Sequence, residues 1–246
     1  MTTESEVSRK STPAYISVGS AYFLSVGVLY LWGYWSRFDI NILEYLGLPD
    51  VIKLTAYPIA SAFIFAIVGA VMGEFTVGEK TLLHGGGRNK LVGVFLNKHK
   101  SKVVGLYVFG TVSLYIFGPE SKWQVLPLLA AIPIYVAAKD AGLFEELKLP
   151  VGTRSIVIYM LSILPFWAYG HGRLDASDIS HGFKYKYLAE SLPGLQIEDP
   201  TKEQNRYKYL GHAGGFIFLL SPDNKTVVIV NFEKIDALRL TSQTSS

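Results

Sequence analysis

Cysteine is absent from this chain of 246 residues, and charged residues make up only 17% of it. Globular domains usually contain about 25% charged residues. Apolar side chains take the place of the missing charge and make up 50% of the chain. The lack of cysteine excludes a disulfide scaffold, a thiolate metal site and a cysteine nucleophile. The apolar content excludes a disordered chain, so the composition favours a protein that passes several times through a membrane.

Five apolar windows approach the length of about 20 residues that crosses a hydrocarbon core. They cover residues 14–35, 54–73, 103–118, 123–138 and 155–170. None contains Asp, Glu, Lys or Arg, which agrees with the high cost of a charge at the centre of a bilayer. The third and fourth windows are short and are joined by a tight turn. Either both segments cross the bilayer, or both turn back within it. The expected fold is a multi-pass α-helical membrane protein with about five transmembrane helices.

The loop between the second and third windows indicates the orientation of these helices. Its basic residues are Lys80, Arg88, Lys90, Lys98, Lys100 and Lys102. The positive-inside rule places this loop, and with it the tail 1–13, in the cytoplasm. Tryptophans lie at the window ends on the side away from this loop, as in an aromatic belt at the outer interface. They are Trp32, Trp35, Trp123 and Trp167. We therefore expect a plasma or bacterial inner membrane protein with an extracytoplasmic C-terminus.

Residues 171–246 differ from the membrane domain predicted at 14–170. They contain period-two segments and no window long enough to span a bilayer, which predicts a small water-facing β or α+β domain. The β-branched and aromatic runs 215–221 and 226–232 are joined by Pro, Asp and Asn, a pattern typical of an antiparallel hairpin. Because a domain of about 75 residues holds only a marginal core, we expect it to pack against the rest of the chain or against a partner.

Small residues of the second window form the clearest helix-packing motif. They recur every four residues, with Ala62, Ala66 and Ala70 on one stripe and Gly69 and Gly73 on another. Small side chains let helix backbones approach closely in a membrane. The stripes therefore predict a contact with a neighbouring helix or an oligomer interface.

Two charged segments flank this window. Arg88, Lys90, Lys98, Lys100 and Lys102 follow a glycine hinge and are expected to contact anionic lipid. On the other side, Asp39, Glu44 and Asp50 lie in a mostly apolar segment. That segment is interpreted as an external docking surface or, in an oligomer, as the mouth of a cation pore.

No constellation of residues indicates catalysis, a metal or a cofactor. His171, Asp175, Asp178 and His181 are close in sequence, but their spacing matches no established set of metal ligands. The first hypothesis is a non-enzymatic integral membrane protein whose β domain senses or binds a partner. The alternatives are a channel or pore-forming homo-oligomer and, least favoured, an outer-leaflet enzyme that uses this histidine and aspartate group. Expected partners are the lipid bilayer and a second copy or another membrane or envelope protein, and no nucleic acid is expected.

Overall fold

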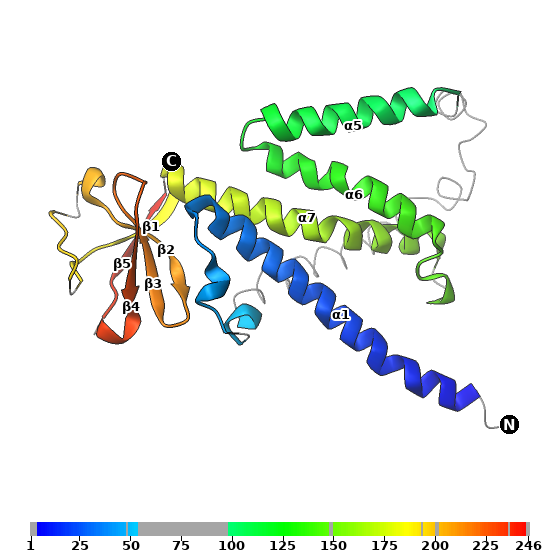
Figure 1. Cartoon of the computed structure of the whole chain (residues 1–246), viewed down its shortest axis with the longest axis horizontal. Helices are drawn as coiled ribbons and strands as arrows, with labels where there is room; N and C mark the ends of the chain where they lie inside the picture. Colours follow the sequence, from blue (N-terminus) through cyan, green and yellow to red (C-terminus); the bar gives the residue numbers. More distant parts are fainter. Residues whose placement is uncertain are drawn as a thin grey trace.

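The computed structural model describes residues 4–47, 49–53, 98–147, 150–192, 194–199, 202–235 and 237–244. Its long helices are α1 (Glu4–Trp35), α5 (Lys100–Phe117), α6 (Lys122–Asp140) and α7 (Val151–His181). Its strands are β1 (Lys184–Leu188), β2 (Lys208–Ala213), β3 (Phe216–Leu220), β4 (Val227–Asn231) and β5 (Leu240–Thr244). Short 3-10 turns cover Ser36–Phe38, Ile42–Glu44, Glu145–Leu147, Glu203–Asn205 and Phe232–Lys234. The strands lie at one end of the molecule and the helices extend away from them (Figure 1).

Helices α1 and α7 lie side by side, and both end at the sheet (Figure 1). Glycines allow this close approach. A Cβ atom on Gly33 would lie 2.2 Å from the carbonyl oxygen of Tyr169, and one on Gly172 would lie 2.3 Å from that of Tyr30. Helix α6 packs on the other side of α7, and α5 packs on α6. The helices therefore form a layered bundle in which α7 is central.

A left-handed glycine ends α7 and leads the chain into β1. Gly182 has φ +77°, a conformation that costs glycine no steric strain. Its N–H donates to Ile179 at 3.1 Å, and the Phe183 N–H donates to the Asp178 carbonyl at 2.9 Å. These bonds form a Schellman motif, which satisfies carbonyls at the end of a helix. The sheet therefore begins directly from the helix end.

The strands form one antiparallel sheet in the order β4-β3-β2-β1-β5. The predicted hairpin is confirmed, because β3 pairs with β4 across the turn at residues 222–225. One sheet face packs on the ends of α1 and α7 through Phe218 and Leu220. The other face, with Ile217 and Leu219, is covered by the connecting segments of the strands. The sheet thus has a core on both faces.

A bulge in β2 connects the sheet to α1. Pairing between β2 and β3 shifts register between Tyr209 and Gly211, which leaves Leu210 without a ladder partner on β3. The hydroxyl of Tyr34 donates to the Leu210 carbonyl at 2.6 Å. A tyrosine of the helix thereby donates to a backbone carbonyl at the bulge.

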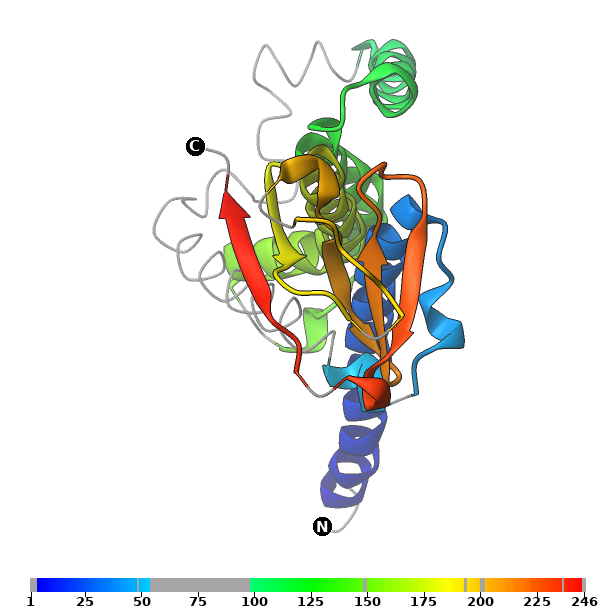
Figure 2. The same cartoon turned by 90° about the vertical axis from the view of Figure 1, so that its left-hand side faces the viewer.

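Residues 36–53, here called the strap, pack against the sheet after α1 ends. Ile42 is only 2% exposed and joins the core between α1 and the sheet. The Tyr45 ring meets Phe216 and Phe218 edge to face, at centroid distances of 5.7 and 5.2 Å. In Figure 2 the strap descends beside the sheet from the end of α1. Packing within the chain therefore explains the apolar side chains of Ile42 and Tyr45, whereas Leu43 and Ile52 are exposed.

The predicted membrane fold is wrong. Among the helices of the described residues, none is long and apolar enough to cross a membrane. Ser, Gly and Tyr interrupt the apolar runs, and several of these residues contact other parts of the chain. Tyr22, for example, donates to the Leu161 carbonyl of α7. The predicted membrane localisation and the inside–outside topology are therefore wrong as well.

The tryptophans do gather at one end of the bundle, where each contacts another aromatic ring of the chain. Trp35 meets Phe218 of the sheet at 4.9 Å between centroids, and Trp167 stacks on His171 at 4.8 Å. Trp32 and Trp123 both contact Tyr169 edge to face. The signal interpreted as an interfacial belt reflects contacts among helices and between helices and the sheet.

The boundary expected between residues 170 and 171 falls inside α7, which continues to His181. Ala176 is fully buried and Ile179 packs on the core shared with the sheet. The polar residues that follow residue 170 end the apolar window, but the helix continues through them. The small-residue stripe of Ala62, Ala66, Gly69, Ala70 and Gly73 lies outside the described residues, and its packing role stays a prediction.

Candidate functional site

An apolar cavity of about 520 Å³ lies between α1, α5, α6 and α7. Its size falls within the range of about 300–1,000 Å³ typical of small-molecule sites. Each of these helices contributes to its wall. The lining residues are Leu29, Trp32, Thr111, Val112, Tyr115, Trp123, Leu126, Pro127, Ala130, Pro165, Phe166 and Tyr169.

Aromatic rings form one wall of this cavity. Tyr169 is central, with its ring centroid 5.6 Å from that of Trp32 and 5.3 Å from that of Trp123. Tyr115 adds a third edge-to-face contact, at 6.0 Å from Trp123. Edge-to-face pairs hold rings in a fixed mutual orientation. The wall is therefore a preformed surface of aromatic edges and faces.

Two polar atoms of the lining residues are buried without a hydrogen-bond partner among the described residues. They are the hydroxyl oxygen of Thr111 and the indole nitrogen of Trp123. Buried polar atoms in native proteins are nearly always paired. An indole N–H can only donate, whereas a hydroxyl both donates and accepts. Both atoms are covered by neighbouring atoms, so neither is open to the cavity in this structure.

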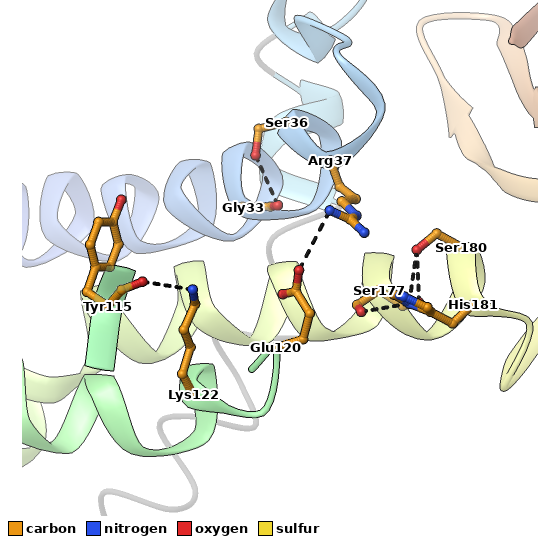
Figure 3. A network of polar contacts seen from close by, with 9 residues as sticks. All are labelled: Gly33, Ser36, Arg37, Tyr115, Glu120, Lys122, Ser177, Ser180 and His181. Carbon is orange, nitrogen blue, oxygen red and sulfur yellow. Dashed lines mark hydrogen bonds and ion pairs between the residues drawn. The ribbon is translucent and has the colours of Figure 1, made fainter. Parts of the chain in front are cut away.

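Polar contacts fix the turn between α5 and α6 beside the cavity (Figure 3). Lys122 Nζ donates to the Tyr115 carbonyl at 2.8 Å, which joins the two helices. Arg37, just after α1, lies 3.6 Å from the Glu120 carboxylate in the turn. Since both side chains of that ion pair are partly exposed, it contributes little to stability. Its effect is to hold the end of α1 near the turn.

Gly170 brings α7 close to α6 beside the cavity. A Cβ atom at this position would lie 2.9 Å from the Trp123 carbonyl oxygen and 3.3 Å from Pro127 Cγ. The missing side chain lets the backbone of α7 approach the first turns of α6. This contact places Tyr169 against Trp123 and so positions the aromatic wall.

A second polar group lies between α1 and α7, but it does not form a catalytic arrangement. The Tyr30 hydroxyl donates to Asp175 Oδ2 at 2.9 Å, and His171 Nε2 lies 3.9 Å from the same oxygen. Burial, and then the Asp175 charge, raise the pKa of Tyr30 well above its ordinary value, so its hydroxyl stays protonated. His181, in contrast, faces back along α7 to the Ser177 carbonyl at 2.8 Å.

The predicted histidine and aspartate group is therefore split. His171 and Asp175 meet, whereas the Asp178 carbonyl takes part in the end of the helix. Across the described ranges, no cluster of three or more His, Asp or Glu side chains could hold a metal ion. The geometry gives no support to the outer-leaflet enzyme.

Lys208 occupies a polar hollow at the end of α7. Its Nζ donates to the Ser180 carbonyl at 3.1 Å and to Asn224 Oδ1 at 3.0 Å. Burial lowers the pKa of this ammonium group. The Ser180 bond satisfies a carbonyl of the last helical turn, where a positive charge is favourable. Lys208 therefore has a structural role at the junction of helix and sheet.

The carboxylates of the strap make separate local contacts. Glu44 accepts from Asn41 Nδ2 at 2.8 Å, and Asp50 accepts from the Gly47 N–H at 3.2 Å. Asp39 ends a 3-10 turn in the left-handed conformation. Apolar residues of this segment, such as Ile42 and Tyr45, contact the chain's own sheet. The predicted pore mouth depended on the membrane fold, and a docking role of the three carboxylates stays a prediction.

The basic residues assigned to lipid are described only in part. Arg88 and Lys90 lie outside the described residues, Lys98 and Lys102 are exposed, and Lys100 begins α5. Their contact with anionic lipid stays a prediction.

The sequence contains no direct signal for the cavity, because the cavity wall comes from four helices that are distant in the chain. Two of the wall residues, Trp32 and Trp123, belong to the predicted aromatic belt at the window ends. Their common position was a usable signal, since residues at the same level of neighbouring helices can meet. Thr111 and Ala130 carried no such signal.

Comparisons of the chain with protein-family models, curated proteins and solved structures find no match.

Proposed function

We propose that this protein is a non-enzymatic binding protein that holds a compact apolar molecule in the cavity between α1, α5, α6 and α7. The observation that carries this proposal is the apolar cavity of about 520 Å³ with its wall of aromatic rings. Apolar pockets with a few polar groups are typical of small-molecule sites.

The position of the cavity suggests how binding would be sensed. Trp32 lines the cavity, and within one helical turn Trp35 packs on Phe218 of the sheet. A ligand that moves the end of α1 would therefore move a residue buried against the sheet. The protein would thus report an apolar ligand to its β region, in keeping with a sensing role.

Nile red tests this proposal, because it is an apolar fluorophore. We expect saturable binding by the full-length protein, with emission shifted to shorter wavelength. Ala130→Phe should weaken binding about tenfold or more, because the added ring fills the cavity. Ala137→Phe is the matched control, since this exposed residue lies on the same helix away from the cavity.

Equal binding by wild type and both variants would mean that the dye binds another surface, and the proposal would be wrong. Circular dichroism spectra of the variants check that the helices are retained.

A further inference from the structure

The two edges of the sheet differ in chemistry. β4 forms one edge and reads Val-Val-Ile-Val-Asn, whereas β5 forms the other and reads Leu-Thr-Ser-Gln-Thr. Natural edge strands are usually protected from pairing by charges, proline or bulges. β4 has no charged residue and no proline, and its pairing with β3 is regular throughout. It therefore lacks the features that prevent pairing with another strand.

Two hydrogen bonds show which backbone groups of β4 face outward. The Ser221 N–H donates to the Thr226 carbonyl, and the Phe232 N–H donates to the Gly215 carbonyl. In an antiparallel pair, alternate residues bond to the partner strand. With Thr226 and Phe232 bonded to the β3 side, Val228 and Val230 bond there too. The N–H and C=O groups of Val227, Ile229 and Asn231 consequently point away from β3, to the outer edge of the sheet.

The outward-facing N–H and C=O groups of β4 can pair with the same groups of a second β4 strand, in a symmetric arrangement centred on Ile229. In an antiparallel pairing of two copies, Ile229 faces Ile229 of the second copy, and Val227 faces Asn231. Each facing pair then exchanges two hydrogen bonds, as in a regular ladder. Ile229 is 40% exposed, and the facing Ile229 of a second copy would cover part of its side chain.

We propose that the edge of β4 binds the β4 edge of a second copy of this chain, which joins two sheets into one continuous antiparallel sheet. The symmetric register requires that the same residues lie on both sides, as in an isologous two-fold interface. The proposal is independent of the cavity, which lies among the helices.

Charge substitutions at the two-fold axis test the pairing. Ile229→Lys and Ile229→Glu each place like charges directly opposite one another, which is destabilising. We expect the wild-type full-length chain to sediment as a dimer, and each variant to show a dimer dissociation constant raised about tenfold or more. An equimolar mixture of the two variants should restore the dimer as a heterodimer, since opposite charges then face each other. This rescue also shows that both variants are folded.

Ser242→Glu supplies the matched control on the other edge. Ser242 is exposed and is paired with Lys186 of β1, so the new carboxylate faces an opposite charge and the substitution should leave the dimer unchanged. The proposal would be overturned by a monomeric wild type, by charge variants that dimerise as well as wild type, by a mixture that stays monomeric, or by dissociation of the Ser242→Glu dimer.

Discussion

The junction of α1 and α7 with the sheet and the exposed helix α5 are built from similar apolar residues but are packed very differently. At the junction, Tyr34, Trp35 and Phe218 are buried together. In α5, which packs mainly on α6, Phe117 is 82% exposed. Small residues explain much of the difference, because Gly33 and Gly172 let two backbones touch. Apolar content alone therefore does not decide burial, which also requires a surface that fits.

The largest effect is expected at the junction, from Gly33→Ala. In a helix interior, alanine normally stabilises by up to about 1 kcal/mol relative to glycine. Here the new Cβ would lie 2.2 Å from the Tyr169 carbonyl oxygen, so α1 and α7 must separate. We expect a net loss of about 3 kcal/mol in the free energy of unfolding, as for other overpacked cores. Chemical denaturation measures this loss, and unchanged stability would show that the helices are less closely packed.

Much of the helix and hairpin pattern could be predicted from the sequence. The windows at 103–118 and 123–138 correspond to α5 (Lys100–Phe117) and α6 (Lys122–Asp140). Local signals suffice for such elements, because apolar runs, Pro and Asn act over a few residues. The environment of the helices could not be predicted this way, since a hydropathy window does not show whether protein lies opposite an apolar face. The interpretation of apolar helices as membrane spans was wrong for this reason.

Long-range contacts were the other part that the sequence did not reveal. Tyr34 and Leu210 are distant in the chain, and their hydrogen bond depends on a bulge whose register is set by the whole sheet. The cavity likewise depends on how closely α7 approaches its neighbours. In α7 itself, Ala176 and Ile179 continued a helical apolar spacing past Asp175, and this signal could have extended the predicted helix.

Alkaline pH should have the next largest effect, on the packing of α1 against α7 and the sheet. Burial raises the pKa of Tyr22 to about 12, and it raises the pKa of Tyr34 further. Because the folded state raises the pKa of these tyrosines, their contribution to stability is complete below pH 10, which is the ordinary pKa of tyrosine. This contribution is lost as the pH rises through 10 towards 12, since the unfolded chain then releases the protons that the folded chain keeps. Thermal melting temperatures should fall over this range, and Tyr22→Phe should make the fall less steep; parallel curves would contradict this assignment.

Tyr34→Phe should have an intermediate effect of about 1–2 kcal/mol, because it removes the donor of a buried hydrogen bond to the Leu210 carbonyl at the bulge. The ring contacts with Trp35 and Phe38 remain. Urea denaturation of the full-length chain measures the loss. Tyr115→Phe is a suitable control, since the Tyr115 side chain is largely exposed and its substitution should change stability by less than about 0.5 kcal/mol. Equal stability of both variants would show that Leu210 has another donor.

The smallest effect, and one of opposite sign, is expected from Gly110→Ala in α5. A Cβ atom at Gly110 meets no atom within 4 Å among the described residues, so nothing resists the added methyl group. The substitution should therefore stabilise the protein by about 0.5–1 kcal/mol, because alanine loses less backbone entropy than glycine in a helix. Gly33→Ala and Gly110→Ala are the same chemical change within helices, and only their surroundings differ. If Gly110→Ala instead destabilised the chain by more than about 1 kcal/mol, α5 would have a close neighbour at this position, and its contrast with the junction would be lost.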